Sequence, residues 1–272
     1  MVSVMPQRTA ISPGALRHLI LEESKRANVG HIASALSIVE ILSALYEHVL
    51  RIEDPADPDR DRFILGKGHA ALALYAAIHL RGWISRDELG TYCADGTWLG
   101  VHPEHAVPGI DLATGSLGQG LSFGVGAALA ARMQGSSRRV FVLVSDAECN
   151  EGAVWEAAMF AAHHRLGHLT VIVDLNGQQA LGHTAEVLDL SPMTARWQAF
   201  GWEASEIDGH DVGALVDALT VPRGDNAAPN VIVARTIAGK GVSFMERQVR
   251  WHYLPMEDDQ YVAALTEIGV SR

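Results

Sequence analysis

The chain has 272 residues, of which 48% are hydrophobic and 19% charged, and this composition excludes a mainly disordered protein. Its formal net charge of −11 argues against nucleic acid and against an anionic membrane surface as partners. The two cysteines, Cys93 and Cys149, lie far apart, which excludes a Cys-x-x-Cys zinc site and a disulfide scaffold. The first residues lack the apolar segment of a signal peptide, and no run of about 18 apolar residues occurs, so we expect a soluble, cytoplasmic protein.

The first half of the chain favours helices over strands. Residues 1–11 form a lead without periodicity, and Ser12-Pro13 is typical of a helix start, with serine as the cap and proline at the first helical position. The helices expected in this half cover residues 13–27, 34–48, 69–80 and 121–133. A short strand is expected at 63–65, and residues 94–120, rich in Gly, Pro and His, predict a long functional loop.

The second half alternates apolar strands with helices. The expected strands cover residues 140–144, 169–173, 202–207 and 231–234, and the expected helices cover 150–166, 192–200 and 211–219. Continuous apolar runs are typical of strands buried on both faces, so the sequence predicts a doubly wound α/β fold, a mostly parallel sheet with helices on both faces. We expect one domain over residues 12–272, with its ligand beyond the carboxyl ends of the strands.

Three motifs in the sequence resemble ligand sites only weakly. Gly66 to Ala71 fits a dinucleotide fingerprint, but no acidic residue ends a second strand at the required distance. Gly239 to Ser243 resembles half of a phosphate-binding loop, but its lysine is not followed by Ser or Thr. His102 and His105 lack a third zinc ligand nearby.

Polar residues follow two neighbouring buried strands. Asp146 comes just after the strand at 140–144, and Asn176 follows the next strand, about thirty positions later. A carboxylate and an amide oxygen on adjacent strand tips suit an octahedral Mg²⁺ whose other ligands are diphosphate oxygens, a backbone carbonyl and water. The helix start after Asp146 offers free N–H groups to phosphates. The alternative is that Asp146 only caps this helix and Asn176 only forms a turn.

Together these residues resemble the motif that binds thiamine diphosphate (ThDP) with a metal ion, Gly-Asp-Gly followed by Asn. The stretch from Glu148 to Ala158 is similar to transketolase. Other segments similar to that family are Gly30-His31, Gly66 to Ala70, Gly100 to Glu104, Thr114 to Gly120, Asp208 to Asp211 and Gly239 to Val242. The resemblance extends in the same order from about residue 12 to about residue 262, and it is greatest to the N-terminal, diphosphate-binding subunit of a split transketolase.

The resemblance implies a set of cofactor ligands. The side chains of Asp146 and Asn176 would coordinate Mg²⁺ (or Ca²⁺ or Mn²⁺), with the backbone carbonyl of Gln178 as a third protein ligand. The backbone at Gly115 and Ala147 would approach the diphosphate.

The resemblance also implies roles for an apolar residue and four histidines. Leu117 would contact the aminopyrimidine, and His69 would donate a hydrogen bond to the diphosphate. His31 and His102 would line the substrate channel, and His252 would lie near the diphosphate and the substrate. Each histidine has a structural alternative, a loop residue whose hydrogen bonds are satisfied locally.

The resemblance implies a partner chain as well. Glu151 and Glu156 would lie beside the cofactor at the interface between active sites, although Glu151 also suits the N-terminus of a helix. In the family a glutamate of the pyrimidine-binding half activates the cofactor, and that half is missing here. We therefore expect this chain to need a C-terminal pyrimidine-binding subunit, in an α2β2 assembly.

Two positions depart from the family pattern. Ser145-Asp146-Ala147 replaces Gly-Asp-Gly, and the added Cβ would strain the backbone if Ala147 required a positive φ. Leu175 replaces a common Asn. These departures suggest a specialised, biosynthetic member of the family.

The sequence thus predicts transfer of a two-carbon ketol unit from a ketose or ketose phosphate donor to an aldose-type acceptor. Two alternatives stay open. One is a related ThDP enzyme that takes its two-carbon unit from a 2-oxo acid such as pyruvate, and the other is a degenerate partner subunit without cofactor.

Overall fold

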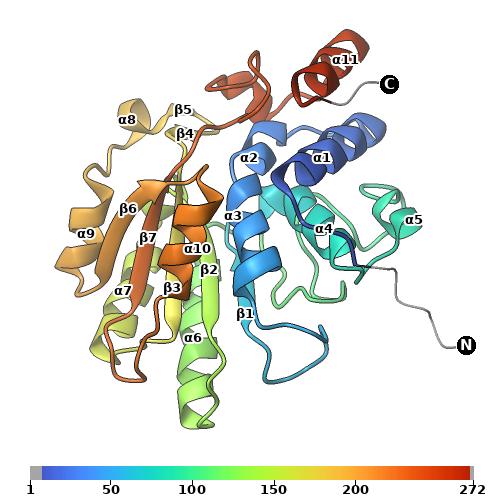
Figure 1. Cartoon of the computed structure of the whole chain (residues 1–272). Helices are drawn as coiled ribbons and strands as arrows, with labels where there is room; N and C mark the ends of the chain where they lie inside the picture. The colour runs from blue at the N-terminus through green and yellow to red at the C-terminus, as the bar shows by residue number, and fades with distance from the viewer. Residues whose placement is uncertain (1–7, 270–272) are drawn as a thin grey trace, which may run out of the picture.

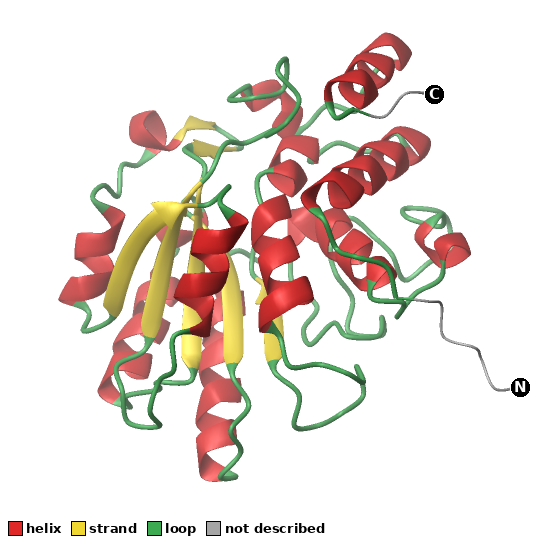
Figure 2. Cartoon of the chain, in the orientation of Figure 1, coloured by secondary structure: helices red, strands yellow, loops and turns green. Residues whose placement is uncertain are grey.

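The structure, a computed structural model, describes residues 8–269 and contains a five-stranded sheet flanked by helices (Figures 1 and 2). The strands are β1 (Arg62–Leu65), β2 (Val140–Ser145), β3 (Leu169–Leu175), β6 (Glu203–Asp208) and β7 (Asn230–Arg235). They are all parallel, in the order β1-β2-β3-β7-β6. All five predicted strands are present, and the predicted α/β fold class is confirmed.

Each face of the sheet carries its own apolar core because alternate side chains of a strand point to opposite faces. Val140, Val142 and Val144 pack on one side, and Phe141 and Leu143 pack on the other. The first face is covered by α6 (Gln119–Met133), α7 (Gly152–His163) and α9 (Met193–Ala199). The second is covered by α1 (Pro13–Ala27), α2 (Ile32–Leu36), α3 (Val39–Ser43), α4 (Ala71–Leu80) and α10 (Val212–Thr220).

The helix predicted at 34–48 is divided into α2, α3 and a π-helical segment, η1 (Ala44–Val49). The break falls at Ser37-Ile38, where the buried Ser37 hydroxyl donates to the carbonyl oxygen of Ser34 and contacts the carboxylate of Asp174. Side-chain bonds of this kind compete with the helical backbone pattern. The prediction of one continuous helix was wrong because tertiary contacts decide this position.

Several short elements were not predicted, and most of them gather beyond the carboxyl ends of the strands, at the top of Figure 1. They are β4 (Gln178–Gln179), β5 (Gly182–His183), α8 (Thr184–Val187), η4 (Val249–His252) and α11 (Asp258–Glu267), together with η3 (Glu148–Asn150). The helix α5 (Arg86–Leu89) and the turn η2 (Gly68–Ala70) precede the long segment from 90 to 118, which contains no regular element, close to the loop predicted at 94–120. Within residues 8–269 no helix is long and apolar enough to cross a membrane. The division into a lead and one domain stays a prediction, since residues 1–7 lie outside the described part.

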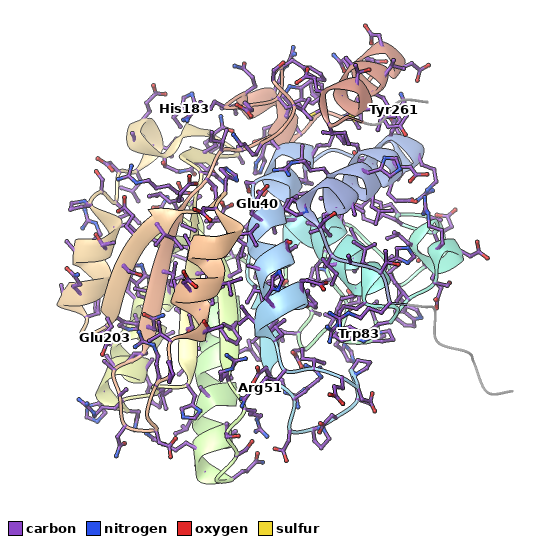
Figure 3. The ribbon with its side chains drawn as sticks, viewed as in Figure 1. Glu40, Arg51, Trp83, His183, Glu203 and Tyr261 are labelled. Carbon is purple, nitrogen blue, oxygen red and sulfur yellow. The ribbon has the colours of Figure 1, made fainter. Side chains whose placement is uncertain are left out.

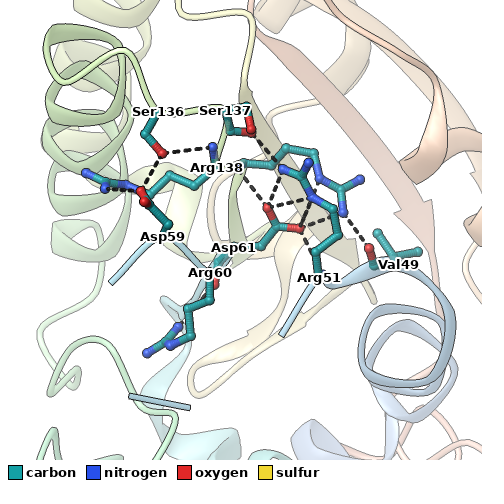
Figure 4. Close-up of polar contacts among 9 residues, drawn as sticks. Val49, Arg51, Asp59, Arg60, Asp61, Ser136, Ser137 and Arg138 are labelled. Carbon is teal, nitrogen blue, oxygen red and sulfur yellow. Dashed lines mark hydrogen bonds and ion pairs between the residues drawn. The ribbon is translucent and has the colours of Figure 1, made fainter. Parts of the chain in front are cut away.

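A buried carboxylate organises the amino-terminal end of the sheet, which is the lower end in Figure 3, where Arg51 is labelled. Asp61 is fully buried and accepts hydrogen bonds from the backbone N–H groups of Arg51 (3.0 Å) and Arg139 (2.8 Å). The guanidinium groups of both arginines also bind it, with Nη2–O distances of 2.8 Å and 2.6 Å (Figure 4). Because Asp61 immediately precedes β1 and Arg139 immediately precedes β2, this carboxylate fixes the two strand starts side by side.

We predict that Asp61→Asn lowers the free energy of unfolding near pH 7 by about 3 kcal/mol, since it removes the buried anionic acceptor that the backbone N–H and guanidinium groups of Arg51 and Arg139 share. Burial raises the pKa of Asp61, but hydrogen bonds from Arg51 and Arg139 outweigh it, and the net pKa lies below its usual value. A depressed carboxyl pKa stabilises the fold above the unfolded pKa, and this stabilisation disappears as the pH falls through the folded pKa. Urea unfolding at a series of pH values should therefore show that the free energies of unfolding of the wild type and of Asp61→Asn become equal in acid.

The matched control is Asp59→Asn. The side chain of Asp59 is 72% exposed and lies 3.6 Å from Arg138, so this change should cost no more than about 0.5 kcal/mol. Equal losses for the two variants, or a pH-independent loss for Asp61→Asn, would contradict the assigned role.

Candidate active site

The tips of β2 and β3 bring Asp146 and Asn176 to the same loop. Ser145 pairs with Asp174 across the two strands, and the N–H of Asp146 donates to the carbonyl of Asp174 at 3.1 Å. The Asp146 carboxylate accepts the N–H of Gly177 at 2.8 Å, and the amide oxygen of Asn176 accepts the N–H of Gln178 at 2.9 Å. The two side chains predicted as metal ligands therefore both bind the three-residue segment 176–178.

Asp146 is a buried carboxylate that lacks a counter-charge. Among residues 8–269, no Lys, Arg or His forms an ion pair with it. Burial and the nearby charge of Asp174 raise the pKa of Asp146 to about 7, although N–H groups of Gly177 and Ala147 lower it. A divalent cation would supply the missing charge, and a carboxylate, an amide oxygen and a backbone carbonyl are oxygen donors that Mg²⁺ accepts. The described residues hold no cluster of three His, Cys, Asp or Glu side chains that could bind a metal, so a metal bound here would need donors of this mixed kind.

A cavity of about 170 Å³ opens beside these strand tips. Seven residues predicted for the site line it: His69, Leu117, Ala147, Glu151, Asn176, Gln178 and His252. Three polar atoms of lining residues are buried without a hydrogen-bond partner, Oδ1 of Asn150 and the Nε2 atoms of Gln178 and Gln179. Buried polar atoms are rarely left unpaired in a folded protein. The orphaned atoms therefore indicate that a polar ligand, such as the diphosphate end of ThDP, completes this cavity.

Under the cavity lies an ion pair that the sequence analysis missed. Lys67 and Asp174 are both fully buried, with 2.5 Å between Nζ and Oδ2. The same carboxylate oxygen accepts the side-chain amide N–H of Asn176 at 2.8 Å, and the other oxygen accepts the hydroxyl of Thr236. Asn176 is thus oriented by Asp174, with its oxygen free of that contact. The signal in the sequence was an aspartate directly after the apolar run 171–173 of a buried strand, because a buried carboxylate requires a partner.

Three of the predicted histidines form a triangle. Ring centroids lie 5.3 Å apart for His31 and His69, 5.3 Å for His31 and His252, and 5.1 Å for His69 and His252. His102 is exposed and lies against Gly115, where an added Cβ would be 3.3 Å from the imidazole ring. The structure thus brings together histidines from segments that lie far apart along the chain.

Burial keeps the triangle neutral near pH 7. Burial, and then the charge of His102, lower the pKa of His31. Burial, Lys67 and the neighbouring histidines hold the pKa of His69 well below its usual value. Burial, His31 and Lys67 lower the pKa of His252 to about 4. A neutral imidazole can donate a hydrogen bond and accept another, and Nδ1 of His31 is buried without a partner, so it is free to bind a ligand.

Two glycines permit this approach of segments. A Cβ on Gly30 would lie 2.1 Å from the carbonyl oxygen of Tyr253, so only glycine allows His31 to sit beside His252. A Cβ on Gly68 would lie 2.8 Å from the carbonyl oxygen of Thr114, which brings the Gly115 loop against the turn that carries His69.

A second buried acid, also missed by the sequence analysis, ties three segments of the site together. Glu148 is fully buried, and its carboxylate accepts N–H groups of Gly118 at 2.9 Å and Ser145 at 3.3 Å. It also lies against the backbone of Gly66, where an added Cβ would be 2.7 Å away. Burial raises the pKa of Glu148 to about 7.

Ala147 does not adopt the positive φ that would have strained its backbone. Its φ is −63° and its ψ is −36°, which is right-handed helical backbone open to any residue. Its N–H donates to the Asp146 carboxylate at 2.9 Å. Alanine in place of the family's glycine therefore costs no backbone strain here.

Glu151 and Glu156 are both exposed. Glu151 is the residue that caps α7, so the alternative of an acidic residue favoured at a helix N-terminus stays open, although its side chain makes no capping hydrogen bond. Glu156 does not line the cavity. Gly115 is exposed near His102, outside the lining of the cavity.

The comparisons with known proteins agree with this geometry. Residues 8–271 match the family described as "Transketolase, thiamine diphosphate binding domain". The chain belongs to the transketolase family. It is therefore a ThDP-binding domain, and transketolases use this cofactor with a divalent metal.

Relatives of this transketolase chain include separate subunits. It is 41% identical over 256 residues to the 6-deoxy-6-sulfo-D-fructose transketolase subunit SqwG of Clostridium sp. strain MSTE9, with 93% of each protein covered. It is 38% identical over 255 residues to an apulose-4-phosphate transketolase subunit of Phocaeicola vulgatus, with 93% of this chain and 91% of that protein covered. The prediction of a separate transketolase subunit, in the transferase class, is confirmed.

The solved structures are those of longer chains. Transketolase from Campylobacter jejuni superposes with a TM-score of 0.88 at 29% identity, covering 94% of this chain and 42% of that one. The transketolase chain described here thus spans about two fifths of the length of the solved transketolases that it matches.

We predict that Lys67→Met in this transketolase subunit lowers the free energy of unfolding by about 3–5 kcal/mol, because it leaves Asp174 charged, buried and unpaired. Burial raises the pKa of Asp174, and Lys67 with its hydrogen-bonding neighbours lowers it to a net value below the usual one. The measurement is urea unfolding followed by circular dichroism.

The control is Lys240→Met, which removes a half-exposed lysine 3.8 Å from Glu246 and should cost less than about 1 kcal/mol. The double variant Lys67→Met/Asp174→Asn should recover part of the loss, since it removes the unpaired charge. A double variant no more stable than Lys67→Met would show that the charge is not the cause.

Proposed function

We propose that this subunit catalyses ThDP-dependent transfer of a two-carbon ketol unit from a ketose or ketose phosphate to an aldose-type acceptor, together with a separate pyrimidine-binding subunit. The observation that carries the proposal is the convergence of Asp146 and Asn176 on one loop beside a cavity with unpaired polar atoms. Full-length similarity to subunits of split transketolases supports it.

Asp146, Asn176 and the carbonyl of Gln178 would hold the metal and, through it, the diphosphate. The Nε2 atoms of Gln178 and Gln179, unpaired here, would donate to anionic oxygens. Bound ThDP supplies an electron sink for cleaving the carbon–carbon bond next to a ketose carbonyl. The chain itself would contribute binding, orientation and the polar groups that line the cavity.

The neutral histidine triangle would form hydrogen bonds with the sugar substrate. His31, His69 and His252 can each donate to one oxygen and accept from another, as the hydroxyl and carbonyl groups of a ketose require. Protonated histidines could donate hydrogen bonds to the sugar but could no longer accept them. His102, at the exposed edge, would meet the outer hydroxyls of the donor.

The partner subunit would cover the face formed by α6 and α7. Large apolar side chains are exposed there: Phe123 (55%), Met159 (52%) and Phe160 (43%). Exposed apolar side chains of this size, close to the acidic residues Glu151 and Glu156, are typical of a surface buried in an assembly. An α2β2 assembly with active sites at its interfaces satisfies both features, and we expect it in the cytoplasm.

The two relatives described above are named for different ketoses, 6-deoxy-6-sulfo-D-fructose and apulose 4-phosphate, so split members of the family differ in substrate. Both of the named sugars contain an anionic group, a sulfonate in one and a phosphate in the other. We propose a ketose donor whose far end carries an anionic group of this kind. We expect a neighbouring reading frame to encode the pyrimidine-binding half, and its product would be the partner in the assay.

We predict that the chain alone transfers no ketol unit at a measurable rate, and that the reconstituted pair does so only with ThDP and Mg²⁺. The measurement is product formation from a panel of ketose phosphates, sulfonated ketoses and pyruvate, with a set of aldose-type acceptors. Pyruvate as the best donor would favour the 2-oxo acid alternative. If the pair binds ThDP in calorimetry but uses no substrate of this panel, the proposed cofactor stands and the proposed reaction is wrong. If the pair does not bind ThDP, the alternative of a degenerate subunit without cofactor is favoured.

We predict that Asp146→Asn weakens Mg²⁺-dependent ThDP binding by roughly 100-fold or more, because it removes the anionic ligand of the metal. Isothermal titration calorimetry of the reconstituted pair checks this, with Asp189→Asn as control, an exposed aspartate whose carboxylate accepts hydrogen bonds from Ser191. Equal affinities for the two variants would remove Asp146 from the metal site.

A further inference from the structure

Two family-like segments have no role in the site described so far. One is the turn Asp208 to Asp211, after β6, and the other is Gly239 to Val242, after β7. The structure joins them through His210, whose Nε2 atom accepts the N–H of Ile237 at 2.9 Å. An imidazole thus holds the backbone that leads from β7 into the second segment.

This contact determines the tautomer of His210. A ring nitrogen that accepts an N–H carries no proton, so Nε2 is unprotonated. The other nitrogen, Nδ1, lies 2.9 Å from Oε2 of Glu40 and must therefore carry the proton and donate it. The ring is neutral and can hold Ile237 only in this form.

Glu40 also contacts the segment after β7 indirectly, through Arg17. Oε1 of Glu40 accepts from Nη2 of Arg17 at 2.5 Å, and Nε of Arg17 donates to the carbonyl of Lys240 at 3.0 Å. Burial raises the pKa of Glu40, but the hydrogen bond from His210 and the charge of Arg17 together outweigh burial. The net pKa lies below its usual value, so the carboxylate stays ionised. Glu40 belongs to α3, and Figure 3 labels it near the middle of the view.

The turn held in this way forms a wall of the cofactor cavity. Ala238 lines the cavity, and so does Ala33, whose carbonyl accepts the N–H of Gly239 at 2.9 Å. Thr236, at the start of the turn, donates its hydroxyl to Asp174, which orients Asn176. A shift of residues 236–239 would therefore move both the wall and the support of a proposed metal ligand.

We propose that His210, in its Nδ1–H tautomer, is a positioning residue that fixes the segment 236–239 against the cofactor cavity. The side chains of His210, Glu40 and Arg17 are 12%, 7% and 11% exposed, so water competes little with their bonds. The assignment of ThDP as the ligand of this cavity rests on the function proposed above. The tautomer of His210 and its hydrogen bond to Ile237 do not depend on that assignment.

The first test is ¹⁵N NMR of the full chain with labelled histidine. We expect the resonances of His210, assigned with His210→Gln, to show a neutral ring protonated at Nδ1. A ring protonated at Nε2, or at both nitrogens, would overturn the proposal whatever the cofactor.

The second test compares His210→Phe with His79→Phe, by calorimetry of ThDP binding to the reconstituted pair. His79 also makes a hydrogen bond to the backbone, from Nδ1 to the carbonyl oxygen of Ile84 at 3.0 Å, but it does not line the cavity. We expect ThDP to bind about tenfold more weakly to His210→Phe, the effect of roughly one lost buried hydrogen bond, and with unchanged affinity to His79→Phe. His210→Gln, which keeps a donor and an acceptor, should lie closer to the wild type.

The outcomes separate the two proposals. If the wild-type pair binds ThDP and the two phenylalanine variants bind it equally, the positioning role is wrong and the proposed function stands. If the wild-type pair binds no ThDP, the proposed function fails, and with it the effect on the cofactor. Should His210→Phe not fold, Glu40→Gln replaces it, since this change removes the charge that holds both His210 and Arg17.

Discussion

The buried ion pair of Lys67 and Asp174 is the interaction on which the rest of the structure depends. Removing two charges from water is costly, and the cost is met only when the remaining hydrogen-bonding capacity is used. Here the carboxylate also binds Ser37, Asn176 and Thr236. One aspartate thus joins the turn after β1, the break between α2 and α3, and the tips of β3 and β7.

Buried acids recur at both ends of the sheet with different consequences. At the amino-terminal end Asp61 is bound by two arginines, which makes a closed cluster with no acceptor left for a ligand. At the carboxyl end, Asp174 and Glu40 each form an ion pair, whereas Asp146 accepts backbone N–H groups and forms no ion pair within residues 8–269. Stability and ligand binding are therefore divided between the two ends, in keeping with the position of ligand sites in parallel sheets.

The histidine triangle follows from the same arrangement. Lys67 lies below it and opposes further positive charge, so the rings stay neutral and retain both hydrogen-bonding functions. The face of α6 and α7, by contrast, leaves large apolar side chains in solvent. Exposed apolar side chains of this size fit a chain that works together with a partner subunit.

The sequence by itself determined the fold class, the five strands and the clustering of Asp146 and Asn176, because apolar periodicity and the geometry of parallel strands are local or follow from chain order. The approach of His31, His69 and His252 was available only by resemblance, since contacts between segments so far apart leave no periodic trace. Tertiary structure alone decided the break at Ser37, the partner of Asp174, the unstrained φ of Ala147 and the tautomer of His210. Each depends on which groups meet in the interior, where an unpaired charge or N–H is too costly to remain.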